Sequence, residues 1–435
     1  CVDHLVLHLS IRRQRQLCIM YSCCSAPGLL PFEDALENML SQITPVTETL
    51  TLPISQALNY VLAQNITSPL NVPNHDNSAM DGYAFAIESL SQGQTLTMVG
   101  RSMAGAPFQG ECKLGECIRI MTGAKIPACC DSVEMQENVQ ADADRITFLK
   151  GKELLGKKLG AHVRKAGEDI QLGQHVLAQG QQLSAVDIGI LASLGVSEVK
   201  VFRKLKVALI ATGDELKLPG QVLNSGDIYE SNSFVLRAML DKLHIDVVDF
   251  GIIEDNFEAI KAAFVSADSQ ADAVISSGGV SVGDADYTKT VLDDLGEIGF
   301  WKIAMKPGKP FAFGKLPNSI FFGLPGNPVS ALVTFHQLAM VALTKMQNAQ
   351  ALKRTTLQVK CGHDLKKSPG RMDFQRGVLN INEAGENVVT STGSQGSGIL
   401  SSLARANCFI VLASEQGKVQ AGEMVSVQLF DRFIC

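Results

Sequence analysis

Residues 271–286 combine the residue types that bind a phosphate group. Val274 and Ile275 form a short apolar run that predicts a buried strand, the glycine- and serine-rich segment 276–283 follows, and a helical pattern begins at Tyr287. Glycines let backbone amides approach phosphate oxygens, hydroxyls add donors, and a helix start favours an anion. The stretch therefore predicts an anion-binding turn between a strand and a helix.

Two carboxylates follow this turn directly. Asp284 and Asp286 are two residues apart and lie beside the glycines. Carboxylate oxygens hold Mg²⁺ against a polyphosphate in many enzymes. The pair therefore predicts a site for a phosphorylated substrate together with Mg²⁺, in which Asp284 and Asp286 are the metal ligands.

A second cluster of charge lies around a Pro-Gly turn. Lys306 and Lys309 flank Pro307 and Gly308, and Lys302 precedes them. Proline fixes its own dihedral angle and glycine accepts the bend, so the lysines are expected on one side of a rigid loop. A single lysine is usually solvated, but three cations beside a phosphate loop favour an oxyanion site.

Several further stretches have more than one interpretation. Asp81 lies in the Asn-, Asp- and Ser-rich segment 74–85, whose composition fits both a structured functional loop and an ordinary surface turn. The charged segment 163–170 has the composition of a solvated loop. Arg371, Arg376 and the Gly/Ser run 393–398 offer anion donors, although such a run by itself is an ordinary flexible loop.

The elements that must position these groups are predicted from the alternation of strands and helices. Apolar runs at 206–211, 245–250 and 273–276 alternate with helical patterns at 234–243 and 257–264, which is typical of a parallel α/β sheet. Ligands of such sheets bind beyond the carboxyl ends of the strands. Residues 212–215, 251–255 and 276–286 all fall at such ends.

The length of 435 residues predicts several domains. We expect an α/β plus β, multidomain, elongated subunit with a central parallel-sheet domain. The predicted parts are an atypical N-terminal extension at 1–27, a helical linking domain at 28–67 and 174–203 that includes a helix at 54–62, an inserted β-rich domain at 68–173, an α/β domain at 204–353 and a small C-terminal β barrel or sandwich at 354–435.

Composition limits the class of function. The net charge of −6 argues against a nucleic-acid partner, because such proteins carry a basic excess. No apolar stretch reaches the eighteen or so residues of a membrane span. The 11 cysteines include no CxxC pair, so reduced cytosolic thiols are expected and no metal is assigned to them. Residues 1–26 lack the charge order of a secretory signal.

Six uncommon motifs together resemble a known family. They are Asn77–Tyr83 (NSAMDGY), Ile120–Ala124 (IMTGA), Gly167–Asp169 (GED), Ser277–Tyr287 (SGGVSVGDADY), Lys306–Pro310 (KPGKP) and Gly323–Pro328 (GLPGNP). In this order they are similar to the MoeA-type molybdopterin molybdenumtransferases, the family that includes the gephyrin E-domain. The resemblance runs from about Gly28 to the end and is specific, because no single motif carries it.

The resemblance implies the last step of molybdenum cofactor assembly, in which molybdopterin-AMP and molybdate give the cofactor and AMP. It implies catalytic roles for Asp286, Asp81, Asp169, Glu215, Lys302 and Lys306, and substrate contacts from Gly278, Gly279, Ser281, Asp284, Lys309, Pro310, Arg371 and Ser397. Ser394 and Ser401 compete with Ser397 for the molybdate contact. The family also implies a cytoplasmic homodimer in which Asp81 acts in trans, with contacts to molybdopterin adenylyltransferase and cofactor acceptor proteins.

Two other functions share part of this pattern. A molybdopterin adenylyltransferase shares the Ser-Gly-Gly-Val-Ser signature but takes ATP as its substrate; the flanking β domains and the 77–83 motif favour insertion. A non-catalytic scaffold of the same fold usually carries a fused adenylyltransferase domain, for which this chain has no room.

Overall fold

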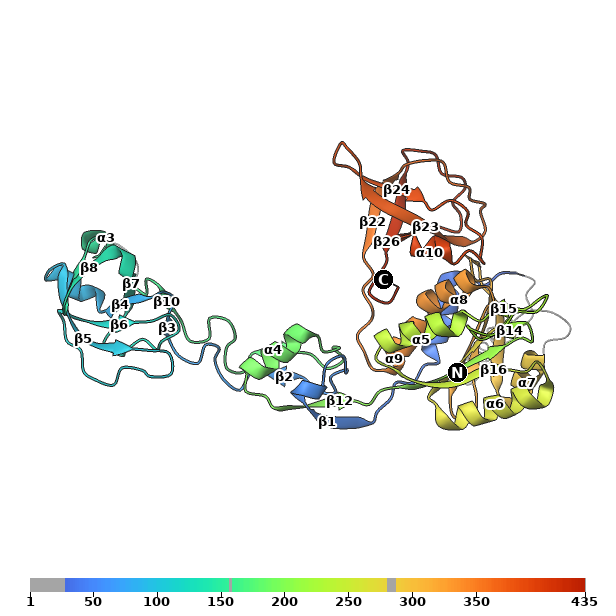
Figure 1. Cartoon of the computed structure of the whole chain (residues 1–435), viewed down its shortest axis with the longest axis horizontal. Coiled ribbons are helices and arrows are strands. Elements are labelled where there is room, and N and C mark those ends of the chain that lie inside the picture. Colours follow the sequence, from blue (N-terminus) through green and yellow to red (C-terminus); the bar gives the residue numbers. More distant parts are fainter. Residues whose placement is uncertain (1–27, 156–158, 280–286, 435) are drawn as a thin grey trace, which may run out of the picture. The chain divides into compact units, whose positions relative to one another are not determined.

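The computed structural model describes residues 28–155, 159–279 and 287–434. The chain divides into two compact units (Figure 1). Unit 1 contains the described residues up to Leu50, together with Asn59–Val61 and the chain from Phe202 onward; unit 2 contains Thr51–Leu58 and Leu62–Val201. The chain therefore leaves unit 1 and returns to it, as expected for an inserted domain.

Unit 1 is built on a six-stranded sheet with the order β16-β13-β17-β21-β20-β18. Its strands are β13 Lys206–Thr212, β16 Asp246–Ile253, β17 Ala273–Ser277, β18 Glu297–Lys302, β20 Pro310–Lys315 and β21 Ile320–Leu324. The strands β16, β13, β17 and β21 pair with one another in parallel. Strand β20 pairs antiparallel with both β21 and β18. The predicted parallel sheet is thus mixed, because the short Lys302–Pro310 connection can join only antiparallel neighbours.

Helices cover both faces of this sheet. One face packs against α2 Phe32–Ser41, α5 Asn232–Lys242, α8 Pro328–Thr334 and α9 Met340–Met346 in a core that includes Leu209, Phe313 and Phe322. The other face packs against α6 Phe257–Gln270 and α7 Tyr287–Leu295 around Phe264 and Phe321 (Figure 1). Strands buried on both faces explain the continuous apolar runs in the sequence.

The C-terminal part of unit 1 is a closed five-stranded barrel. Its strands are β22 Thr356–Cys361, β23 Met372–Ile381, β24 Asn387–Ser391, β25 Cys408–Leu412 and β26 Met424–Leu429, with α10 Ser401–Ala404 between β24 and β25. The pairing of β23 with β25 closes the ring. The short strand β19 Met305–Lys306 pairs with Met372 and Asp373 of β23, so the lysine loop and the barrel are joined by backbone hydrogen bonds.

Unit 2 contains a second six-stranded sheet with the order β7-β4-β6-β5-β9-β8. Its strands are β4 Gly82–Phe85, β5 Thr95–Ser102, β6 Glu116–Ile120, β7 Ser132–Met135, β8 Val139–Asp142 and β9 Arg145–Phe148. Tyr83 and Phe85 pack on one face and Ala84 on the other, as the two-residue period of a strand requires. The inserted β-rich domain is therefore present.

The remainder of unit 2 is less helical than predicted. It contains β1 Thr49–Pro53 paired with β12 Glu198–Phe202, β2 Ile66–Thr67 paired with β11 His175–Leu177, β3 Asn77–Ser78 paired with β10 Val163–Arg164, and the helices α3 Gly151–Leu155 and α4 Ala185–Ser193. The helix predicted at 54–62 is wrong, because only Ile54–Gln56 forms a single 3₁₀ turn. The helix α4 lies in the predicted linking segment 174–203, and Ser184 caps it.

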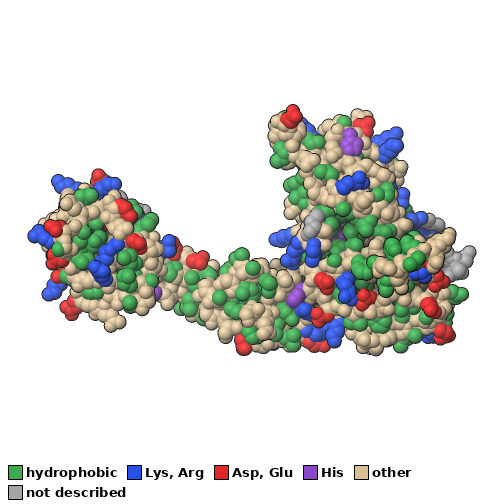
Figure 2. Space-filling view, viewed as in Figure 1, with side chains coloured by type: hydrophobic (Ala, Val, Ile, Leu, Met, Phe, Trp, Pro, Cys, Tyr) green, Lys and Arg blue, Asp and Glu red, His purple; other side chains and the backbone are tan. Residues whose placement is uncertain are grey.

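The expectation that no segment is long and apolar enough to span a membrane is also wrong, because one helix meets both criteria of length and composition. Residues Pro328–Met346 form 19 consecutive helical residues with a mean hydropathy of 1.3. In its most apolar 18-residue window, 89% is buried inside the structure, so this segment is the core helix of the α/β domain. On the face shown in Figure 2, acidic and basic side chains are interspersed.

The middle of this core helix is a π-helical turn, Phe335–Ala339, and it holds a buried histidine. His336 is 1% exposed; its Nε2 lies 2.9 Å from Asp431 Oδ2, and its Nδ1 lies 3.1 Å from Gln337 Nε2. An amide nitrogen can only donate, so Nδ1 accepts and Nε2 carries the proton. Burial lowers the pKa of His336 below its ordinary value of 6.5, which favours this neutral form.

This histidine predicts a loss of stability in mild acid. The unfolded chain binds the proton more readily than the folded one, so the free energy of unfolding should fall by up to about 1.4 kcal/mol per pH unit below about pH 6.5. In His336→Gln this slope should be absent, and in the exposed control His363→Gln it should remain. Urea unfolding between pH 5 and 8 measures it; equal slopes in the two variants would contradict the prediction.

Candidate functional site

The glycine turn predicted as a phosphate site lies at the carboxyl end of β17. Gly278 has φ +94° and its N–H donates to the Leu324 carbonyl oxygen at 3.1 Å, which joins the ends of β17 and β21. A Cβ at Gly278 would lie 2.8 Å from the Thr212 carbonyl oxygen. Only glycine fits here. Because the Gly278 amide already donates to Leu324, it is not free to donate to a phosphate oxygen.

Gly279 is enclosed by two threonines. It has φ +64°, and a Cβ there would lie 2.3 Å from Thr288 Oγ1 and 3.0 Å from Thr212 Oγ1. The Thr212 hydroxyl is buried and has no hydrogen-bond partner among the described residues. An unpaired buried hydroxyl costs free energy, which a ligand oxygen at this point would recover. Thr212 is thus a candidate contact that the sequence did not single out.

Asn232, the first residue of α5, ties two loops of this edge together. Its Nδ2 donates to Ser277 Oγ and to the Gly326 carbonyl oxygen, both at 2.8 Å. Ser277 ends β17 and Gly326 follows β21, so one side chain fixes the spacing between the two loops. Sequence reasoning missed Asn232 because its partners lie far away in the chain.

We expect Asn232→Ala to lower activity about tenfold, because two hydrogen bonds worth about 1 kcal/mol each no longer hold the loops at their spacing. The matched control is Asn256→Ala. Asn256 caps α6 by accepting from the Ala259 N–H at 2.8 Å, so its loss should reduce stability by about 1 kcal/mol without changing the rate. Steady-state rates and urea unfolding of both variants test this; equal loss of activity in the two would contradict it.

The Gly/Ser run of the C-terminal barrel reaches the same edge. The Val329 N–H donates to the Ser397 carbonyl oxygen at 3.0 Å, which places Ser397 at the start of α8. Buried Arg376 holds the run by donating to the Gly396 carbonyl oxygen and to Ser402 Oγ, both at 3.0 Å. Arg376 therefore acts as a support for the loop rather than as a ligand donor, and the run is not a free flexible loop.

The lysine loop lies at this edge as well. Lys302 pairs with Pro310 across β18 and β20, and Ala312 pairs with Gly323, so Lys302 and Pro310 lie where β21 ends. Lys302 and Lys309 are exposed. The Ile303 N–H donates to the Lys309 carbonyl oxygen at 2.8 Å and closes the loop.

A cluster of cations surrounds one buried carboxylate beside this loop. Lys306 Nζ lies 3.4 Å from Asp373 Oδ2, and Asp373 is 3% exposed. Lys367, which is 6% exposed, lies near Asp373. Burial lowers the pKa of Lys367, and the charges of Lys306 and Arg371 lower it further, whereas the charge of Asp373 raises it. Glu415 also acts on Lys367, so three cations and two carboxylates leave an excess of positive charge. Sequence reasoning found Lys306 and Arg371 but missed Lys367 and Asp373.

Acidic side chains gather at the ends of β13 and β16. The Glu215 carboxylate lies against Gly213, since a Cβ added at this glycine would be 2.8 Å from Glu215 Oε2. The Asp255 N–H donates to Asp214 Oδ1 at 3.1 Å. Burial raises the pKa of Asp255, and the charges of Asp214 and Glu215 raise it further. Crowded carboxylates of this kind suit a hard divalent cation. The sequence placed Asp255 at a strand end, as part of the segment 251–255, but did not identify it as a site residue.

Unit 2 holds the remaining predicted acids. Asp81 Oδ1 accepts from the Thr122 N–H at 2.7 Å and from Thr122 Oγ1 at 2.8 Å, and these bonds lower its pKa. The motifs at 77–83 and 120–124 therefore meet in space. Asp169 is exposed, and its N–H donates to the Val72 carbonyl oxygen at 3.0 Å. Within the solvated segment 163–170, Lys165 pairs with Asp76 at 2.7 Å.

Three predicted site residues, Ser281, Asp284 and Asp286, lie outside the described residues, so the structure places neither the expected metal pair nor the serine. Within unit 1, the described part brings Gly278, Gly279, Glu215, Lys302, Pro310 and Ser397 to one edge of the sheet.

Three family models together match most of the described chain. The model described as "MoeA N-terminal region (domain I and II)" matches residues 30–195, "Probable molybdopterin binding domain" matches 208–345, and "MoeA C-terminal region (domain IV)" matches 358–430.

Full-length relatives agree with these matches. A molybdopterin molybdenumtransferase of Haemophilus influenzae is 49% identical over 93% of this chain and 100% of its own length, and that of Nostoc is 33% identical over 92% and 93%. The crystal structure of a molybdopterin biosynthesis moeA protein from Pyrococcus horikoshii superimposes with a TM-score of 0.79 at 29% identity, covering 92% of this chain and all of that one. This chain therefore belongs to the molybdopterin molybdenumtransferase family of the MoeA type.

Proposed function

We propose that this protein is a transferase that inserts molybdenum into adenylylated molybdopterin, consuming molybdate and releasing AMP in the last step of molybdenum cofactor biosynthesis. The observation that carries the proposal is the shared edge of the unit 1 sheet. There a glycine turn with an unpaired threonine hydroxyl, crowded carboxylates and the lysine loop all meet. A phosphoanhydride and an oxyanion together need these three kinds of group.

The chain's own groups supply positioning and charge. Gly279 and the Thr212 hydroxyl face the phosphate side, where donors stabilise the charge that develops as the anhydride breaks and AMP departs. Lys302, Lys306, Lys309 and Arg371 attract molybdate, a tetrahedral dianion that such donors bind as they bind sulfate. Ser397, held at the start of α8, is the serine we assign to it.

We further propose Mg²⁺ as the cofactor. The donor set fits, because the raised pKa of Asp255 beside Asp214 and Glu215 records a local excess of negative charge that a hard cation would relieve. Glu215 and Asp255, together with Asp284 and Asp286, which the sequence predicts as metal ligands, are the residues that would hold it. When bound, the ion would neutralise charge on the anhydride oxygens.

The proposal is tested with purified protein, molybdopterin-AMP and molybdate. We expect AMP and active cofactor in equal amounts, the latter detected by activation of a cofactor-free molybdoenzyme. The alternative activity, adenylylation, is tested with molybdopterin and ATP in the absence of molybdate. Robust formation of molybdopterin-AMP in that mixture would overturn the assignment in favour of an adenylyltransferase. AMP release without cofactor would exclude insertion.

We also propose a cytoplasmic homodimer in which Asp81 and Asp169 of one subunit serve the site of the other. Co-expression of Asp81→Asn and Lys306→Ala subunits with different tags tests this. Mixed dimers contain one site with both residues intact if Asp81 acts in trans, so their activity at low molybdate should exceed that of either variant alone. No recovery in purified mixed dimers would contradict the arrangement.

A further inference from the structure

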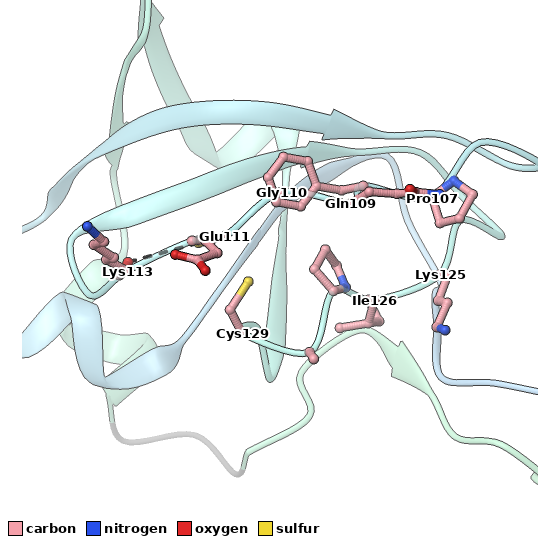
Figure 3. A pocket seen from close by; sticks show the side chains of 12 residues that line it. Pro107, Gln109, Gly110, Glu111, Lys113, Lys125, Ile126 and Cys129 are labelled. Carbon is pink, nitrogen blue, oxygen red and sulfur yellow. Dashed lines mark hydrogen bonds between the residues drawn. The ribbon is translucent and has the colours of Figure 1, made fainter.

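Three cysteines of unit 2 converge at the edge of the inserted domain. The Sγ atoms of Cys112, Cys129 and Cys130 all lie within 4.8 Å of one another, and those of Cys129 and Cys130 are 3.8 Å apart. They adjoin a cavity of about 570 Å³ that Glu111, Cys112, Lys113 and Cys129 help to line. Figure 3 shows Cys129 with its sulfur directed toward the segment that carries Glu111 and Lys113.

The backbone fixes both segments that carry these thiols. The Cys130 N–H donates to the Pro127 carbonyl oxygen at 2.9 Å, which closes a turn and sets the two adjacent cysteines at one end of it. On the other side, Cys112 directly precedes a turn in which the Glu116 N–H donates to the Lys113 carbonyl oxygen at 3.0 Å. The two turns therefore fix the backbone on both sides of the sulfur atoms.

We propose that Cys112, Cys129 and Cys130 bind a thiophilic metal ion of the closed-shell type represented by Zn²⁺ and Cu⁺. With metal–sulfur bonds of about 2.3 Å at a tetrahedral angle, ligand sulfurs lie about 3.8 Å apart. The Cys129–Cys130 separation of 3.8 Å matches this spacing. Thiolate sulfur is the ligand that selects such ions over Mg²⁺.

The open side of the cluster decides the coordination. Among the described residues, no fourth His, Cys, Asp or Glu atom joins the three sulfurs. The cavity can admit a water molecule as a fourth ligand for Zn²⁺, whereas Cu⁺ is satisfied by three sulfurs. The cluster consists of unit 2 residues, and its binding of a metal does not depend on the molybdenum-insertion proposal.

Two other roles of buried cysteines fit less well. A cysteine can serve as a small apolar side chain, as Cys117 does: it is fully buried in a core on the other face of the sheet. Cys130 is 9% exposed and packs in a core as well, but Cys112 and Cys129 are only partly buried. A disulfide between neighbours would need the sulfurs at about 2.05 Å.

The test titrates the reduced full-length chain anaerobically with Zn²⁺ alone and with Cu⁺ alone, each against a coloured chelator. We expect one ion per chain that Cys112→Ser and Cys129→Ser each weaken by more than about 100-fold, since removing a ligand costs at least as much as removing its supporting partner. Cys117→Ala, the matched control from the same domain, should bind as the parent does. The chain has 11 cysteines, and others could also bind metal. The site is therefore assigned from the difference in affinity between the parent and each variant.

A second measurement uses the unaltered chain, so that it is independent of the folding of any variant. Bound metal should protect Cys112, Cys129 and Cys130 from alkylation, as peptide mapping would show, without changing the alkylation of Cys361. Equal affinity in the parent and both serine variants would overturn the proposal, as would a Cys129–Cys130 disulfide in the metal-free chain that excludes the ion. The metal that competes more strongly identifies the ion.

Discussion

Gly278→Ala is expected to lower the rate of AMP release by about 100-fold while the protein stays folded. The new Cβ would lie 2.8 Å from the Thr212 carbonyl oxygen, which belongs to a buried strand and cannot rotate away. The turn must therefore move, and displacement of a reacting group by on the order of 1 Å costs about 100-fold in rate. Single-turnover AMP release at saturating substrate measures the effect.

The matched control separates misplacement from backbone strain. Gly220 has the same φ of +94°, but a Cβ there meets nothing within 4 Å. Gly220→Ala and Gly278→Ala should both lose about 1–2 kcal/mol of stability, since alanine is strained in this region. Only Gly278→Ala should lose activity. If the two variants were equally active, the glycine turn would have no part in the site.

Lys306→Ala is expected to raise the molybdate concentration needed for half-maximal activity by about 10- to 100-fold, with little change in affinity for the adenylylated pterin. Losing one charge-assisted contact to an oxyanion costs about 1.5–3 kcal/mol, which corresponds to that range. The pair with Asp373 itself contributes less than about 1 kcal/mol to stability, because the Lys306 side chain is 43% exposed. High molybdate should restore the rate, which a titration at fixed pterin would show.

Two comparisons test the specificity of this effect. Lys315→Ala removes an exposed lysine at the far end of β20, where it pairs with Ile320 at the start of β21, and should leave the molybdate requirement unchanged. Lys306→Ala combined with Asp373→Asn restores the local charge balance without restoring the cation. If the double variant used molybdate as the parent does, Lys306 would serve only to neutralise Asp373.

Local sequence determined the parts of the site that neighbouring residues make together. The apolar run ending at Ser277 and the glycines after it predicted a strand and a turn, and both are confirmed by β17 and by the positive φ values of Gly278 and Gly279. The Lys302–Pro310 loop was found in the same way. These features depend on dihedral preferences and on the period of buried side chains, which act within a few residues.

Tertiary structure decided everything that joins distant segments. Only the fold shows that the Gly278 amide donates to the Leu324 carbonyl oxygen and that Asn232 bridges two loops. It also shows that the Asp255 amide donates to Asp214. Near the barrel, Lys306 lies beside Asp373 and Lys367. In the fold, the helix predicted at 54–62 is replaced by a single 3₁₀ turn, and three cysteines that form no CxxC pair lie close together. Pairing across the chain is fixed by which surfaces bury together, and no local propensity carries that information.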